Sequence, residues 1–185
     1  MEHQTLCIIQ EYANYMSIGQ LISNRIALNK RREFLSDAPA LDSSYYFPEN
    51  LIWKGLIQCL IALKHIHSKN IIHRDIKSAN ILLHFESQKP SKVLNDNPDL
   101  SDATFKITDF NISTFTSTGY HYSPTGTPFF ASPEMLLKKL YTFNNDIWSL
   151  GVTFYHLITL ELPFKASNID KMIIAHQKGR ILQLP

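Results

Sequence analysis

The stretch that decides the fold of this 185-residue chain is HRDIKSAN, at positions 73–80. Asp75, Lys77 and Asn80 leave this one loop together, so a carboxylate, a cation and an amide point the same way. Phosphoryl transfer needs such a set: the carboxylate accepts the proton of a hydroxyl, the cation neutralises charge on the moving group, and a neutral oxygen holds a metal ion. The stretch therefore predicts phosphoryl transfer, and a polar turn after a helix is the alternative.

Apolar spacing on both sides of this loop predicts a mostly helical domain with one small hairpin. Strands are expected at 81–83 and 105–107, paired as a hairpin whose connection, 86–102, is a polar insertion. A further buried strand is expected at 6–9, and 30–50 is expected to be a loop. Helices are expected at 18–28, 51–67, 133–140, 146–160 and 168–178.

Composition and charge indicate one ordinary globular domain. Hydrophobic residues make up 44% of the chain, and the net charge is +2 without a basic stripe, which argues against nucleic acid as a partner. The most apolar stretch, 147–160, is too short and too polar to span a membrane. Cys7 and Cys59 are expected to be buried thiols. The expected location is the cytoplasm, with the nucleus as the alternative, because nothing resembles a signal peptide.

Three further motifs follow the loop in order. TDFN, at 108–111, places an aspartate directly after the second hairpin strand. GTPFFASPE, at 126–134, runs into a helix that begins with a proline, and DIWSLG, at 146–151, opens a buried helix. Each motif is weak by itself, but together and in this order they point to one enzyme family.

With these motifs the chain resembles the eukaryotic protein kinases, and within them the NIMA-related serine/threonine kinases, over nearly its whole length. The resemblance implies an α+β, protein-kinase-like fold: a mostly helical C-terminal lobe with a small β-hairpin at the active-site edge, and an N-terminal lobe that is largely missing. Residues 1–16 would be the last strand of that lobe and the hinge. Residues 17–185 would be the C-terminal lobe, truncated after the helix at about 168–178.

The resemblance also implies roles for the residues that carry the chemistry. Asp75 would be the catalytic base, and Lys77 would neutralise charge on the phosphoryl group and contact ATP. Asn80 and Asp109 would contact ATP through Mg²⁺, which they would hold with hard oxygen ligands. Thr127 together with Lys77 is the pair typical of serine/threonine kinases, so protein serine and threonine hydroxyls are the expected substrates.

The N-terminal residues of the chain resemble the hinge that binds the adenine of ATP. Backbone groups of Glu11 and Ala13 would bond the adenine ring, with Gln10 as the gatekeeper. Ser17 falls where an acidic residue often meets the ribose. ATP and Mg²⁺ are therefore the cofactors that the resemblance implies.

Four residues are expected to support the site without reacting. His73 would pack against Phe110 rather than act as an acid or base. Asp146 would brace the backbone of the 73–80 loop from its helix. Glu134 would pair with an arginine further along the chain, and no residue fills that role convincingly here.

Arg74 next to Asp75 implies control by phosphorylation, because a guanidinium makes bidentate bonds to phosphate. Ser123 occupies the usual phosphosite of the similar kinases, and phosphorylation there is expected to order its loop. Thr125 and the threonines within 114–118 are the alternatives. The phosphate would come from an activating kinase or from self-phosphorylation of the 114–125 loop.

Two neighbouring histidines, His65 and His67, raise the question of a metal site. Their spacing directs them to different faces of the expected helix, which is poor geometry for shared ligation. Ordinary histidines at the end of a helix are therefore the preferred interpretation.

Three departures from the kinase pattern leave the function open. No glycine-rich loop or strand lysine precedes the hinge, and the chain stops at Pro185. Asn111 stands where the family has glycine, and asparagine is expected to tolerate the positive φ of that position. The preferred interpretation is a serine/threonine kinase whose 185-residue chain shows no phosphotransfer by itself. The alternatives are a catalytically dead pseudokinase scaffold and an incomplete gene-model fragment.

Overall fold

The computed structural model describes residues 7–35, 45–86, 99–123, 125–164 and 166–179. Six helical segments and two short antiparallel sheets make up this part of the chain. The helices are α1 (Ile18–Leu35), α2 (Glu49–Ser68), a 3₁₀ turn (Ser78–Asn80), α3 (Pro133–Leu136), α4 (Asn144–Thr159) and α5 (Ile169–Lys178). The strands are β1 (Ile71–Ile72), β2 (Ile81–His84), β3 (Thr104–Ile107) and β4 (Thr114–Phe115).

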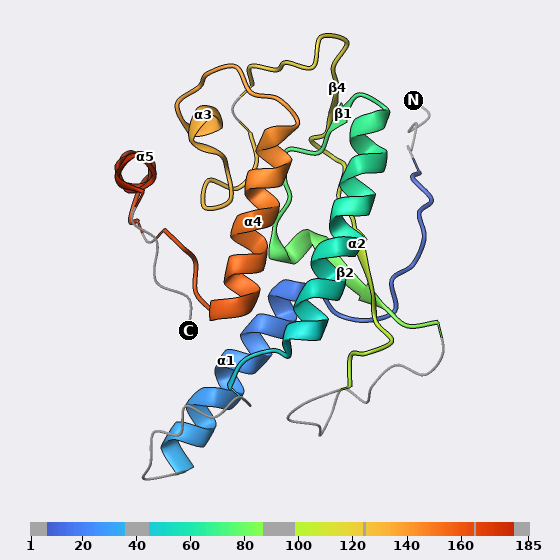
Figure 1. Ribbon diagram of the computed structural model, residues 1–185, viewed down its shortest axis with the longest axis vertical. Coiled ribbons are helices and arrows are strands. Elements are labelled where there is room, and N and C mark those ends of the chain that lie inside the picture. The colour runs from blue at the N-terminus through green and yellow to red at the C-terminus, as the bar shows by residue number, and fades with distance from the viewer. Residues whose placement is uncertain (1–6, 36–44, 87–98, 124, 165, 180–185) are drawn as a thin grey trace, which may run out of the picture.

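The expected mostly helical α+β fold with a small hairpin is confirmed. Helices α2 and α4 lie side by side, and the loop that joins β1 to β2 passes between them (Figure 1). The hairpin pairs β2 with β3 antiparallel, with Ile81 opposite Ile107 and Leu83 opposite Phe105. Its first strand alternates between buried and half-buried residues, because one face of the hairpin packs on the helices. The insertion expected at 86–102 lies largely outside the described residues.

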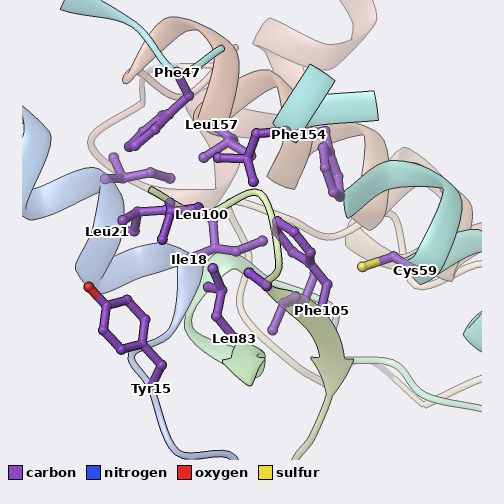
Figure 2. Close-up of a cluster of buried hydrophobic side chains, with 14 of the residues drawn as sticks. Tyr15, Ile18, Leu21, Phe47, Cys59, Leu83, Leu100, Phe105, Phe154 and Leu157 are labelled. Carbon is purple, nitrogen blue, oxygen red and sulfur yellow. The ribbon is translucent and has the colours of Figure 1, made fainter. Parts of the chain in front are cut away.

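The main core lies where α1, α2, α4 and the hairpin meet. Ile18, Leu83, Phe105 and Leu157 come from four different elements and converge in one cluster (Figure 2). Gly55 of α2 allows the close approach of β3, since a Cβ atom there would lie 2.8 Å from the Phe105 ring. This packing fixes the hairpin, and therefore the loop before it, against α2.

A second, smaller cluster supports the other side of the loop. Ile72, Ala131, Met135 and Tyr141 pack together there. Strand β1 contributes Ile72 and pairs with β4, so the loop that begins after β1 is held at its start. The loop is thus anchored by one cluster where it enters and by the main core where it leaves.

The buried strand expected at 6–9 is wrong over its described part. Residues 7–10 form no strand, Ile8 and Ile9 are 74% and 98% exposed, and Cys7 is an exposed thiol, whereas Cys59 is buried as expected. Within the described residues no strand pairs with this segment, so its apolar side chains have nothing to cover them. Leu6 lies outside the described residues.

From Asn14 onward the N-terminal segment runs along the hairpin, and the Asn14 side chain bonds the backbone just after β2 as a neighbouring strand would. Its Nδ2 donates to the Phe85 carbonyl at 2.7 Å, and its Oδ1 accepts from the Phe85 N–H at 2.9 Å. Tyr15 N–H then donates to the Leu83 carbonyl at 3.2 Å. These bonds lay the segment before α1 along β2.

Helix boundaries differ from expectation at two places. Helix α1 continues to Leu35 although its apolar spacing stops near Leu28, because the Lys30-Arg31-Arg32-Glu33 run consists of good helix formers on a solvated face. Helix α3 ends at Leu136 rather than at residue 140, and Lys138 then adopts a positive φ of 54°. The other three long helices end within two residues of the expected positions, and no described helix is long and apolar enough to cross a membrane.

Candidate active site

Asp146 of α4 fixes the backbone of the loop that follows β1. Its carboxylate is fully buried, and accepts hydrogen bonds from the His73 N–H at 2.8 Å and the Arg74 N–H at 2.9 Å. His67, in the last turn of α2, makes a third contact through Nε2 at 2.8 Å. Charge-assisted bonds of this kind are about twice as strong as neutral ones. The structure thus places Asp146 where it determines the path of the loop.

Three donors converge on the carboxylate of Asp75, which is 9% exposed. Lys77 Nζ lies 2.6 Å from Oδ2, and Asn80 Nδ2 lies 3.1 Å from the same oxygen. The Thr127 hydroxyl donates to Oδ1 at 3.0 Å and accepts from Lys77 Nζ at 3.0 Å. The carboxylate is therefore held in one orientation by a lysine, an amide and a hydroxyl.

Gly126 permits the approach of Thr127 to the loop. It adopts a φ of +88°, which L side chains rarely adopt, and a Cβ atom there would lie 2.5 Å from the Arg74 carbonyl oxygen. The segment before α3 can therefore run directly against the loop. This close contact brings together residues that lie 52 positions apart, Asp75 and Thr127.

The hairpin brings Asn80 and Asp109 to one end of the site. Asn80 precedes β2 and Asp109 follows β3, and the Thr108 N–H donates to the Asn80 carbonyl at 3.0 Å. Asn80 directs Nδ2 to Asp75, so its Oδ1 points elsewhere. An amide oxygen and a carboxylate are hard ligands of the kind Mg²⁺ prefers. Among the described residues no cluster of three or more His, Cys, Asp or Glu side chains could hold a metal ion.

The positive φ after β3 belongs to Asp109, not to Asn111. Asp109 has a φ of 68°, and Asn111 is absent from the described residues with positive φ. The positive φ that asparagine was expected to tolerate at residue 111 is therefore not required of it in this structure. Asparagine is accommodated because the left-handed residue of this turn lies two positions earlier.

His73 is a buried packing residue with both ring nitrogens bonded. Its Nε2 lies 3.1 Å from the Thr108 carbonyl, its Nδ1 accepts from the Asp75 N–H at 3.3 Å, and its ring lies 4.7 Å from that of Phe110. Burial lowers the pKa of His73. A neutral ring that donates from Nε2 fits all three contacts, and it leaves no nitrogen free for proton transfer to a substrate.

The hinge-like segment lies beside the hairpin. Glu11 is exposed and forms an ion pair with Lys106 of β3, and this contact lowers the pKa of Glu11. Ala13 is half-buried, and Gln10 is exposed. Ser17 is buried at the start of α1, where its hydroxyl accepts from the Gln20 N–H at 3.2 Å and its N–H donates to Gln20 Oε1 at 3.0 Å. This reciprocal pair is a capping box, and the Ser-x-x-Gln spacing in the sequence is its signal.

Arg74 contacts the segment that follows β3 through Ile112 and His121. Its Nε donates to the Ile112 carbonyl at 2.5 Å, and its Nη1 lies 2.8 Å from Nε2 of His121. Ser123 is exposed, and its carbonyl accepts from the Tyr141 hydroxyl at 2.8 Å. Thr125 is half-buried. The contact of His121 with Arg74 has no local signal in the sequence, since 47 positions separate the two residues.

Two of the remaining sequence-based expectations have mixed outcomes. Glu134 lies half-buried in the first turn of α3, and no ion pair is formed by it within the described part of the chain. His65 is exposed, as expected of an ordinary helix-end residue. His67, by contrast, has a structural role, because it contacts the buried carboxylate of Asp146.

The comparison with protein families identifies the class of protein that has this site. The family description "Protein kinase domain" matches residues 1–184. The chain belongs to the protein kinase family. The resemblance to NIMA-related serine/threonine kinases is confirmed as well, since the curated relatives of this kinase domain are kinases of that group.

Three relatives illustrate the range of similarity. The chain is 32% identical over 94% of its length to the serine/threonine-protein kinase nekl-2 of Caenorhabditis elegans. It is 32% identical over 97% of its length to Nek8 of Danio rerio, and 35% identical over 94% to Nek5 of Homo sapiens. The chain spans 42% of the length of the first relative, 21% of the second and 20% of the third. Serine/threonine kinases are therefore the class of enzyme to which this kinase domain belongs.

Proposed function

We propose that this domain transfers the γ-phosphoryl group of ATP to serine and threonine hydroxyls of protein substrates. The observation that carries the proposal is the convergence of Lys77, Asn80 and Thr127 on the carboxylate of Asp75. A carboxylate that is held in one orientation by surrounding donors suits a group that must meet a substrate hydroxyl at a fixed angle. The family comparison supports phosphorylation of proteins in general terms.

In the proposed mechanism Asp75 would accept the proton of the substrate hydroxyl while that oxygen forms its bond to the γ-phosphorus of ATP, and the bond from phosphorus to the departing ADP would break. Lys77 is bonded to Asp75 and Thr127, and its ammonium group neutralises charge on the transferring phosphoryl group. Thr127 bridges the lysine and the carboxylate, so the segment that carries it orients both. Protein side chains here act by position and charge, which is where most of the catalysis of this reaction class arises.

ATP and Mg²⁺ are the proposed cofactors, and the side chains present fit them. Asn80 Oδ1 and the Asp109 carboxylate would hold Mg²⁺, which supplies positive charge beside the phosphates when it is bound. Backbone groups of Glu11 and Ala13 would bond the adenine, while Ser17 would contact the ribose from the first turn of α1. The capping bonds of Ser17 hold its hydroxyl at the helix start, so that contact would use the remaining capacity of the hydroxyl.

Regulation by phosphorylation forms part of the proposal. Ser123 is exposed and therefore accessible to an activating kinase or to a second molecule of the same kinase. A phosphate on Ser123 would carry negative charge into the segment that contacts Arg74, and guanidinium groups bind phosphate bidentately. The cytoplasm or the nucleus is the proposed location.

The experiment compares four forms of the full-length protein that contains this chain: the parent, Asp75→Asn, Lys77→Met and the control Asp102→Asn. Asp102 is exposed in the turn before β3, so its carboxylate lies on the surface. The readout is Mg²⁺-dependent transfer of labelled phosphate to matched serine, threonine and tyrosine peptides. We expect Asp75→Asn to lower kcat by about 10²–10⁴-fold, the usual contribution of a positioned base. The control should retain parental activity.

A second readout is independent of turnover. Nucleotide binding in the presence of Mg²⁺, measured by calorimetry, should weaken in Asp109→Asn and persist in Asp75→Asn, because only the former removes a proposed metal ligand. Undiminished transfer by Asp75→Asn would refute the catalytic role. Nucleotide binding without any transfer by the parent would favour a pseudokinase scaffold instead.

A further inference from the structure

Arg74 of the loop is in direct contact with His121. The guanidinium of Arg74 is bonded on two sides, to the Ile112 carbonyl through Nε and to His121 through Nη1. The Nη1 to Nε2 distance is 2.8 Å, which is a short hydrogen bond between two nitrogens. Arg74 is half-buried, and its φ of 70° shows that the backbone is held in a strained conformation at this point. The arginine therefore has a built-in partner from the segment between β4 and α3.

His121 is itself fixed by the chain on its other side. Its N–H donates to the Tyr141 carbonyl at 2.9 Å, and the Tyr141 N–H donates to the His121 carbonyl at 3.0 Å. The two rings meet edge to face with centroids 5.6 Å apart. Tyr141 is buried in the smaller cluster with Ile72, which directly precedes the loop. His121 thus joins this cluster to the residue before Asp75.

The bond requires a neutral imidazole. A guanidinium can only donate, so Nε2 must carry a lone pair, and protonation of His121 would place two cationic donors against each other. Partial burial and the nearby Arg74 charge both lower the pKa of His121. The groups that face the ring from the packed elements are the Arg74 guanidinium and the Tyr141 phenol, and the phenol donates to the Ser123 carbonyl. Within the described residues, no carboxylate contacts the ring to stabilise its charged form.

The backbone of the loop connects Arg74 to the site. The carbonyl of Arg74 is the group against which Gly126 packs, and Thr127 follows with its hydroxyl on Asp75. Release of Arg74 would free the 112–123 segment, which leads into this contact. The orientation of Thr127 would then be less restricted.

We infer that His121 is a positioning residue for phosphotransfer, which holds Arg74 and the 112–123 segment in place when Ser123 carries no phosphate. The inference rests on the proposed function of the same site. Acid breaks the contact, because proton uptake by His121 removes the acceptor. A phosphate on Ser123 would supply an alternative acceptor for Arg74, so phosphorylation would make the arrangement independent of His121.

The test uses the full-length protein after phosphatase treatment, with mass spectrometry confirming that Ser123 is unmodified. Two variants separate the roles of the ring. His121→Phe keeps a ring against Tyr141 but removes the acceptor, and His121→Gln supplies an acceptor oxygen that does not titrate. The matched control is His65→Phe, since His65 is exposed on α2. For each form, kcat and the KM for ATP are measured between about pH 5.5 and pH 8, the range around the ordinary histidine pKa of about 6.5.

Loss of the acceptor nitrogen at residue 121 should lower kcat and leave nucleotide binding nearly unchanged. We expect His121→Phe to lose about tenfold in kcat at pH 7.5, roughly what loss of one charge-assisted hydrogen bond costs, with little change in KM. His121→Gln should retain most of the parental kcat and lose less of it on acidification than the parent does. His65→Phe should follow the parent throughout. Phosphorylated His121→Phe should regain activity.

A second measurement does not depend on activity. The imidazole nitrogens of His121 are titrated by NMR in the parent and in Arg74→Met, and the midpoint should lie below about 6.5 in the parent and rise in the variant. Equal midpoints, or full activity of dephosphorylated His121→Phe, would overturn the inference. If the parent transfers no phosphate, the proposed function has failed, and the titration still decides whether His121 holds Arg74.

Discussion

The replacement of Asp146 by asparagine should destabilise the domain more than any conservative change on its surface. The two carboxylate oxygens accept from two backbone N–H groups and from His67, and the side chain is fully buried. An amide offers one acceptor oxygen, so its NH₂ group would oppose at least one of these buried N–H groups. The change therefore removes an acceptor and also leaves a donor without a partner.

The cost follows from these contacts. A buried donor left without a partner costs about 1–3 kcal/mol, and loss of charge assistance in the remaining bonds adds about 1 kcal/mol. We therefore expect the free energy of unfolding to fall by about 3 kcal/mol, a large share of the 5–15 kcal/mol typical of domains. With a urea m-value of about 2 kcal/mol/M, the unfolding midpoint should fall by about 1.5 M at unchanged m.

The assay is urea denaturation followed by circular dichroism, with Asp102→Asn as the control. Asp102 is exposed, so its replacement should move the midpoint very little. Hydrogen exchange adds a local readout, because the amides of His73 and Arg74 should exchange faster in Asp146→Asn. A midpoint change no larger than that of the control would refute the role assigned to the buried carboxylate.

Three further predictions concern the thiols, the packing of α2 and the response to acid. Burial raises the pKa of the Cys59 thiol to about 12, so iodoacetamide at pH 8 should alkylate the exposed Cys7 and spare Cys59 until the protein is unfolded, as peptide mass spectrometry would show. Gly55→Ala should lower the free energy of unfolding by about 1–3 kcal/mol, because the new Cβ meets the aromatic ring of Phe105 in β3. Gly151→Ala has open space around it and should stabilise α4 slightly. Thermal melts of the two variants measure both effects. Burial lowers the pKa of His176, so the folded state binds fewer protons than the unfolded state does. The stability of the domain should therefore fall as the pH drops from about 6.5 through the lowered pKa. In thermal melts between about pH 5 and pH 8, His176→Phe should make the stability depend less on pH.

Local patterns in the sequence were sufficient for most elements of the fold. The hairpin was predictable because one short apolar strand directly follows the HRDIKSAN loop and another directly precedes TDFN. These two strands are β2 and β3, which pair antiparallel. Helices α2 and α4 were predictable from apolar spacing, since each buries one face in the main core. Helix α5 was predictable from the same spacing, although it packs beside α3 instead. The strand expected at 6–9 failed because a strand is stable only with neighbours, and periodicity in one segment does not reveal whether it has any.

The conformation of single residues was less predictable. Asn111 was expected to carry the positive φ after β3, but Asp109 carries it. A motif fixes which residue types occur in a turn, whereas the backbone angles depend on how both ends of the turn are anchored. The role of Ser17 was only partly predictable for the same reason. It lies at the proposed ribose position, but its bonds with Gln20 show that it also caps the start of α1.

The sequence by itself determined the order of the motifs, the family, and the set of residues on the loop that carries Asp75. These features are encoded within a few positions of one another, so a linear pattern reveals them. Only the tertiary structure revealed that Thr127 hydrogen-bonds Asp75, that His67 contacts Asp146 and that His121 hydrogen-bonds Arg74. Such contacts join residues about 50 to 80 positions apart. They exist only after α2, α4 and the segment before α3 have packed around the loop, because packing rather than local propensity sets distances between remote side chains.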